Sequence, residues 1–192
     1  MKKLLLIIAA TAIACMACKD NKKNDNQVTS NPEEVKTEAD SAKVEEEESS
    51  KAMDMAGKKA PDFILKDLND KDFKLSSLKG QYVVVDFWGT WCVWCLFGMP
   101  EMKKYYDKYE GKFQIVSIAC GDELENWKKS VAELEMTWVN VINQDDSDND
   151  ITKPYNVDGF PTKFIVNPKG VIEKVYIGED PAFYEYLDKI FG

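Results

Sequence analysis

Two cysteines, Cys92 and Cys95, are separated by two residues and follow closely after an apolar segment, residues 82–88. If the chain beyond Cys92 is helical, this spacing brings the second sulfur within bonding range of the first. Free backbone N–H groups at the start of a helix, and the positive end of its dipole, stabilise a thiolate there. Because the thiolate is the attacking species, we predict that Cys92 is the nucleophile and Cys95 the resolving thiol.

The composition excludes most other catalytic chemistry. The 192 residues contain no histidine, and all 25 basic residues are lysine. Ser-His-Asp and Cys-His catalysis, imidazole metal ligands and bidentate arginine clamps are therefore absent. With 34 acidic residues the net charge is −9, and no basic stripe is present, so we expect no nucleic-acid partner. We also expect no cofactor and no metal, because only Cys120 remains as a further cysteine ligand after residue 60.

An inert structural disulfide is the alternative interpretation of the pair in an oxidising compartment. A bridge that closes so small a loop constrains the unfolded chain little, which favours the redox interpretation. Cys120, at the end of the second predicted strand, is expected to be a small buried hydrophobic residue.

The elements that must position the cysteine pair are strands and helices in alternation. Continuous β-branched and aromatic runs at 82–88 and 113–119 predict strands buried on both faces. The further expected elements are a hairpin-like start at 60–65 and 73–75, helices at 92–109, 122–134 and 181–191, a strand at 138–142, and a hairpin of 162–166 with 170–177. This order predicts an α/β fold with a mixed central sheet and helices on both faces.

The N-terminus has the pattern of an export signal. Two lysines precede an apolar run that ends too early for a membrane-spanning helix, so residues 1–18 are predicted to be a secretory signal. A signal that closes on small residues and a cysteine resembles a bacterial lipoprotein signal. We predict lipidation at Cys18, which a polar tail follows, with Cys15 or an ordinary cleaved signal as alternatives.

Residues 19–57 contain almost no large apolar side chain and are rich in Asn, Lys, Glu and Ser. Such a segment buries too little apolar area to offset its ordering entropy, so we expect a disordered tether. Composition changes near residue 60, and residues 58–192 are expected to form a single folded domain.

From residue 60 onward the chain resembles the thioredoxin-like TlpA/ResA group of exported or membrane-anchored thiol:disulfide oxidoreductases. The similarity covers about 70% of the chain, and its motifs occur in the order of the family. They are Ala60-Pro61-Asp62-Phe63, residues 75–80, Val85-Asp86-Phe87-Trp88, Trp91-Cys92-Val93-Trp94-Cys95, Met99-Pro100 and Gly159-Phe160-Pro161-Thr162.

The resemblance implies a thioredoxin-like fold and further site residues. Pro161 is expected to be a cis proline whose loop offers backbone to a bound substrate, and Phe160 precedes it. Trp91 and Trp94 are expected to line the sulfurs or to help dock a partner. Asp86 is expected to be buried, which would raise its pKa and let it accept the proton of the resolving thiol; a carboxylate held by backbone hydrogen bonds is the alternative.

Two positions depart from the family pattern. Trp94 precedes the second cysteine, where proline is usual, and Gly98 stands where ResA-type members have a glutamate near the site. The acid–base assistance of that glutamate is therefore not expected from residue 98.

We predict a lipid-anchored oxidoreductase of the bacterial envelope or periplasm. It would act on disulfide-containing or thiol proteins as a reductase or isomerase, recharged by a membrane electron donor. A non-catalytic thioredoxin-like binding lipoprotein is one alternative. A peroxiredoxin-like peroxidase is another, but such enzymes need an arginine and a threonine three residues before the nucleophile, where Gly89 stands here.

Overall fold

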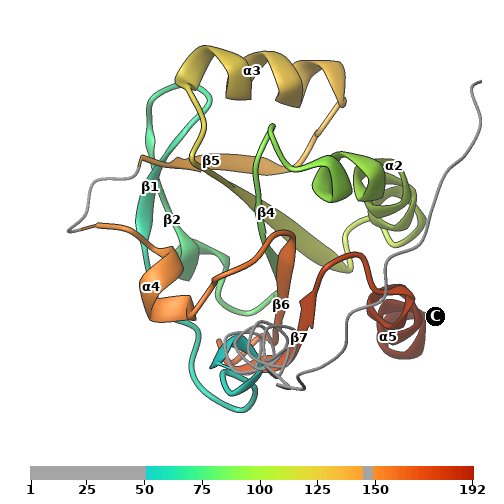
Figure 1. The fold of residues 1–192 in the computed structure, drawn as a ribbon. Coiled ribbons are helices and arrows are strands. Elements are labelled where there is room, and N and C mark those ends of the chain that lie inside the picture. The colour runs from blue at the N-terminus through green and yellow to red at the C-terminus, as the bar shows by residue number, and fades with distance from the viewer. Residues whose placement is uncertain (1–50, 145–148) are drawn as a thin grey trace, which may run out of the picture. The chain divides into compact units, whose positions relative to one another are not determined.

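The computed structural model of the protein describes residues 51–144 and 149–192 (Figure 1). The predicted signal sequence, both candidate lipidation sites Cys15 and Cys18, and most of the predicted tether lie outside these residues. Within the two described ranges, no helix combines the length and the apolar character needed to cross a membrane.

Within residues 51–144 and 149–192, seven strands form one mixed sheet. They are β1 (Ile64–Asp67), β2 (Asp72–Lys74), β3 (Tyr82–Trp88), β4 (Phe113–Cys120), β5 (Val139–Asn143), β6 (Thr162–Val166) and β7 (Ile172–Ile177). Their order across the sheet is β2-β1-β5-β4-β3-β6-β7. Strands β3, β4 and β5 are parallel, while the two outer pairs run antiparallel to their neighbours. The predicted α/β class with a mixed sheet is confirmed.

The central strand β3 is buried almost throughout, as its unbroken apolar sequence predicts. It pairs with β4 on one side and β6 on the other, so that Asp86 lies directly opposite Ser117 and Lys163. Successive side chains point to opposite faces of a strand. Asp86 therefore shares a face with Val84 and Trp88, and these two belong to the same core cluster as Cys92 and Cys95.

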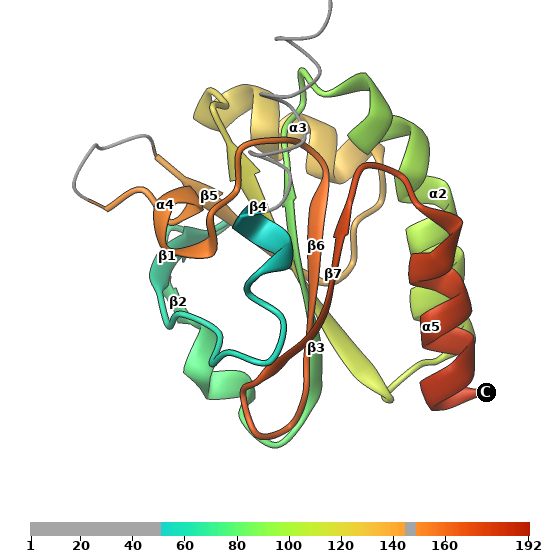
Figure 2. The same cartoon turned by 60° about the horizontal axis from the view of Figure 1, so that its bottom comes forward.

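In the described part of the chain, that face is covered by helices α2 (Val93–Lys108), α3 (Leu124–Glu133) and α5 (Pro181–Phe191). The side chains that they bury there are Met99, Met102, Trp127, Val131, Phe183 and Leu187. The opposite face is covered by the 3-10 helix η1 (Leu75–Leu78), by the short helix α4 (Thr152–Tyr155) and by residues 51–57. Figure 2 shows α2 and α5 on one side of the sheet and α4 on the other.

Three details differ from the expectations. Residues 51–57, which their composition assigns to the tether, pack on the sheet through Ala52 (1% exposed) and Met55 (6%). Helix α4 has no counterpart among the predicted elements, because four residues are too few for a periodic pattern; its first turn is held by the Asp150 carboxylate, which accepts from the Thr152 N–H at 3.0 Å. The helical spacing of Leu124, Trp127 and Val131 predicts that all three share one buried face of α3, but Leu124 is 40% exposed at the first turn.

Candidate active site

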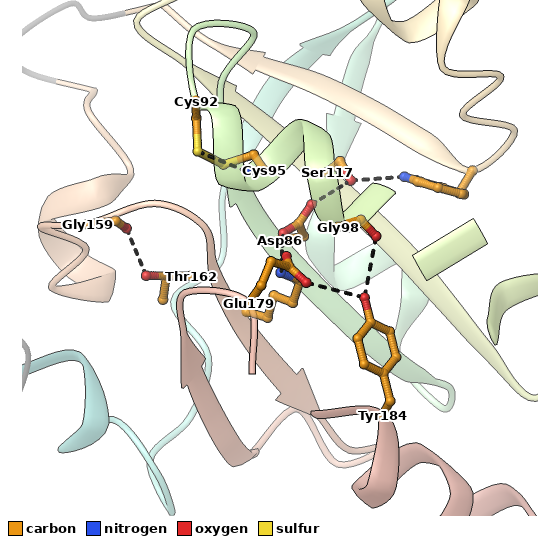
Figure 3. Close-up of polar contacts among 11 residues, drawn as sticks. Asp86, Cys92, Cys95, Gly98, Ser117, Gly159, Thr162, Glu179 and Tyr184 are labelled. Atoms are coloured by element: carbon orange, nitrogen blue, oxygen red, sulfur yellow. Dashed lines mark hydrogen bonds and ion pairs between the residues drawn. A yellow bond between two sulfur atoms is a disulfide. The ribbon is translucent and has the colours of Figure 1, made fainter. Parts of the chain in front are cut away.

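The turn from β3 into α2 carries both cysteines. Cys92 is the N-cap residue of α2, and it forms a disulfide with Cys95, one turn further along (Figure 3). The Cα atoms of the two residues are 5.2 Å apart. The Sγ of Cys92 accepts a hydrogen bond from the Cys95 N–H at 3.2 Å. The sulfur of the predicted nucleophile therefore accepts from a backbone amide of the first helical turn.

The two cysteine residues differ in their exposed fractions. Cys92 is 6% exposed and Cys95 is 1% exposed. The larger exposed fraction of Cys92 agrees with its predicted role as the nucleophile. This fraction is nevertheless small for a residue at the start of a helix. Of the two cysteines, Cys92 has the larger accessible surface, so it is the one that a substrate disulfide would contact first.

The residues just before Cys92 are fixed by contacts to the end of β4. The indole N–H of Trp91 donates to the carbonyl of Cys120 at 2.9 Å, and the Thr90 N–H donates to Asp122 at 3.0 Å. The Trp91 ring lies so close to Gly89 that a Cβ there would be 2.5 Å from the indole nitrogen. A side chain at residue 89, such as the threonine that a peroxiredoxin needs, would displace the Trp91 indole from this position.

Exposed aromatic side chains lie close to Cys92 in the sequence, and each contacts another aromatic ring. Trp91 is 55% exposed and contacts the ring of Phe160, with 5.2 Å between ring centroids. Trp94 is 66% exposed and contacts Phe97, which is 75% exposed. Phe97 was not predicted, although its spacing of three residues from Trp94 places both on one helix face. Trp88, by contrast, lies in the core.

The peptide bond between Phe160 and Pro161 is cis, as the resemblance implies. The loop is fixed on both sides: the Thr162 hydroxyl donates to the carbonyl of Gly159 at 2.8 Å, and the Gly178 N–H donates to the carbonyl of Pro161 at 2.7 Å. The contact between Phe160 and Trp91 brings this loop next to the residue that precedes the nucleophile.

Asp86 is completely buried on the face of the sheet that also holds the cysteines. The Ser117 hydroxyl donates to its Oδ2 at 3.0 Å and itself accepts from the Trp138 indole at 2.9 Å. Among the described residues no donor hydrogen-bonds its Oδ1, so backbone donors do not hold the carboxylate. Burial raises the pKa of Asp86 to about 6, against the opposing effects of Lys163 and the Ser117 hydrogen bond.

Two charged residues next to Asp86 were missed by the sequence reasoning. Lys163, opposite Asp86 on β6, places its ammonium 4.0 Å from Asp86 Oδ1 and 2.6 Å from Glu179 Oε1. Glu179 lies in the turn between β7 and α5 and contacts Tyr184 (Figure 3). A lysine inside the otherwise uncharged strand segment Thr162–Val166 was the available signal, because a buried lysine requires an acidic partner.

A redox-active disulfide at a helix start, with a cis proline next to it on a mixed sheet, defines a thioredoxin-like thiol:disulfide oxidoreductase. The AhpC/TSA family matches residues 56–175. The thiol-disulfide oxidoreductase ResA of Bacillus subtilis is 34% identical over 140 residues, which is 70% of this chain and 75% of the relative. The thioredoxin-like protein YneN of the same organism is 33% identical over 125 residues, 64% of this chain and 71% of the relative.

Solved structures agree. The thioredoxin domain of a thiol-disulfide oxidoreductase from Bacteroides vulgatus superposes with a TM-score of 0.65 at 30% identity, covering 71% of this chain and 98% of that one. A thiol:disulfide interchange protein from Bacteroides sp. superposes with a TM-score of 0.64 at 31% identity. The superposition covers 71% of this chain and 90% of that one. The chain belongs to the AhpC/TSA family and, within it, to the TlpA/ResA-like thiol:disulfide oxidoreductases. Its redox centre is the Cys92–Cys95 pair.

Proposed function

We propose that this oxidoreductase works as a reductase or isomerase on protein disulfides in the bacterial envelope. The observation that carries the proposal is the position of Cys92: its sulfur meets a backbone amide at the start of α2, and the residue is more exposed than Cys95. The absence of a histidine, which stabilises the thiolate in oxidising relatives, favours this direction over that of a strong oxidant.

In the first step the thiolate of reduced Cys92 attacks one sulfur of the substrate disulfide. A bond forms between Cys92 and that sulfur, and the other substrate sulfur leaves as a thiolate, which takes up a proton. The amides at the start of α2 supply the stabilisation that keeps Cys92 ionised near neutral pH.

In the second step Cys95 resolves the mixed disulfide. Its thiol gives its proton to Asp86, and the resulting thiolate attacks the Sγ of Cys92, which releases the second substrate thiolate. The raised pKa of Asp86 suits this role, because a base with a pKa near the working pH transfers protons most effectively. The enzyme ends as the disulfide, and a membrane electron donor reduces it for the next cycle.

Substrate binding is assigned to the exposed aromatic residues and the cis-proline loop. Trp91, Trp94 and Phe160 were predicted for this role together with Pro161, and exposed Phe97 extends the same surface. Large rings give much contact area at a small entropic cost, so they suit a surface that must accept extended segments of different proteins.

The envelope location rests on the N-terminal sequence. Residues 1–18 would be a lipoprotein signal, Cys18 the lipidated residue, and the acidic segment after it a tether that lets the anchored domain reach its partners. Mass spectrometry of membrane-extracted protein tests this assignment. An acylated N-terminal Cys18 supports it, whereas acylation at Cys15 or an unmodified N-terminus contradicts it.

Trapping tests the order of attack. Cys95→Ser should accumulate protein adducts through Cys92 in the native envelope, because the resolving step is lost, while Cys92→Ser should trap none. Equal behaviour of the two variants would contradict the assigned roles. Turnover with hydrogen peroxide but with no protein disulfide would support the peroxidase, and no turnover with either would support a binding protein.

A further inference from the structure

Lys163 is shared unequally between two carboxylates. Its ammonium lies 2.6 Å from Glu179 Oε1, a hydrogen-bonding distance, but 4.0 Å from Asp86 Oδ1. The side chains of Lys163 and Asp86 are 2% and 0% exposed, and that of Glu179 is 17% exposed. The lysine therefore forms its hydrogen bond with the outer acid, although the fully buried acid has an oxygen to which no described residue donates.

Glu179 is held in place from both sides. Gly178, with a positive φ of 76°, forms the turn that directs Glu179 back over α2. The Tyr184 hydroxyl lies 3.4 Å from both Glu179 Oε2 and the carbonyl of Gly98 (Figure 3). A Cβ on Gly98 would collide with the Glu179 carboxylate.

Space, and not backbone conformation, therefore explains the glycine at position 98. Gly98 lies inside α2 and does not have a positive φ, so its backbone does not require glycine. Glycine inside a helix is about 1 kcal/mol less favourable than alanine, so another reason for it is needed. The carboxylate of Glu179 fills the volume that a side chain at this position would need.

We propose that Glu179 is a positioning residue of the redox site, which draws the Lys163 ammonium away from Asp86 and so keeps Asp86 able to accept the proton of Cys95. The proposal rests on the assignment of Asp86 as the proton acceptor in the resolving step. If Lys163 instead paired closely with Asp86, the carboxylate would be stabilised in its charged form and would be a weak base.

The charges around Asp86 fix the sign of each substitution. The groups that face it are Lys163 from β6, Glu179 from the β7–α5 turn and the Ser117 hydroxyl from β4, with Cys95 on α2 as the proton donor. Glu179 raises the pKa of Asp86 and Lys163 lowers it. Glu179→Gln removes one negative charge and also frees the ammonium to approach Asp86, so both effects lower the pKa.

The experiment follows the two thiol steps with an aromatic disulfide that releases a coloured thiolate at each step. The second release reports the attack by Cys95, and its rate should fall on the acid side as Asp86 becomes protonated. In Glu179→Gln the midpoint of this acid limb should move down by about one pH unit. In Lys163→Met it should move up, and the matched control Asp188→Asn, at an exposed ion pair, should leave it unchanged.

Titration of the Asp86 carboxyl by ¹³C NMR in Glu179→Gln measures the pH midpoint of Asp86 protonation directly, without catalysis. A midpoint that stays at the wild-type pH, or moves up, would overturn the positioning role. Asp86→Asn separates the two claims, since it should abolish the acid limb. If the limb persists in that variant, the proton-acceptor assignment fails, and the NMR titration still decides whether Glu179 controls Asp86.

Discussion

Two ion pairs of this molecule have nearly the same geometry and very different surroundings. Lys163 and Glu179 are 2.6 Å apart with side chains 2% and 17% exposed, while Lys108 and Asp188 are 2.7 Å apart with side chains 48% and 42% exposed. Tyrosine hydroxyls contact both carboxylates. The Tyr184 hydroxyl lies 3.4 Å from Glu179, and the Tyr105 and Tyr109 hydroxyls donate to Asp188 at 3.1 and 2.6 Å.

This difference shows that burial, and not contact distance, decides how strongly a charge pair affects stability and the proton affinity of its neighbours. The exposed pair joins α2 to α5 at the surface, where water and salt screen it. Lys163 of the buried pair lies opposite Asp86, and both Lys163 and Glu179 influence the proton affinity of that carboxylate. We therefore expect the same substitution to act on function and stability at one site and hardly at all at the other.

Removal of the two lysines should give the largest contrast. Lys163→Met leaves Asp86 and Glu179 without their cation in the interior, so the free energy of unfolding should fall by about 3–5 kcal/mol. Lys108→Met, the matched control, should lower it far less. Urea unfolding at pH 7 measures both, and equal losses would contradict the role assigned to burial.

The pH dependence of stability should separate the two aspartates. The pKa of Asp86 rises from 3.8 to about 6 on folding, so between those values the unfolded chain releases a proton that the folded protein keeps. Stability therefore falls as the pH rises, by about 3 kcal/mol in total and about 2 kcal/mol between pH 4 and 7. Asp86→Asn should remove this loss, and denaturant unfolding of variant and wild type at both pH values measures it.

Asp188 is the control with the opposite sign. Lys108 and Tyr109 hold the pKa of Asp188 below its ordinary value, so its stabilising effect is present at neutral pH and is lost as the pH falls below about 4. The stability difference between Asp188→Asn and wild type should therefore stay nearly constant between pH 4 and 7. A parallel pH response of the two aspartate variants would show that burial of Asp86 does not shift its titration.

The smallest of these effects is expected at Gly98. Gly98→Ala forces the Glu179 carboxylate aside, and such overpacking costs about 1–3 kcal/mol, more than the alanine gains in helix propensity. In a Glu179→Ala background the space is free, so the same change should be neutral or stabilising. A double-mutant cycle by urea unfolding measures this coupling, and additive effects would contradict the close approach.

Much of the fold was predictable because its signals are local. The continuous apolar run of β3 and the capped periodic pattern of α5 give the observed limits, Tyr82–Trp88 and Pro181–Phe191. The cysteine pair and the cis proline were recognisable from the motifs around them. The packing of residues 51–57 was not, because two small contacts, Ala52 and Met55, decide it within a polar segment.

The charged cluster was unpredictable for a different reason. Lys163 meets Asp86 through the register of two strands that lie far apart in the sequence, and Glu179 reaches Lys163 from a turn. The local sequence around Gly98 shows a glycine inside a helix but does not indicate what fills the space beside it. That a carboxylate from another element fills this space depends on how α2 and α5 pack, which no local pattern encodes.

The central claim is that the start of α2 stabilises the thiolate of Cys92. Its most direct test is the rate of alkylation of Cys92 by iodoacetamide in the reduced protein, followed by peptide mass spectrometry as a function of pH. We predict a midpoint near pH 7, well below the value of about 8.5 for a free cysteine. A midpoint at about 8.5, or a Cys92 that iodoacetamide cannot reach in the folded protein, would contradict the account.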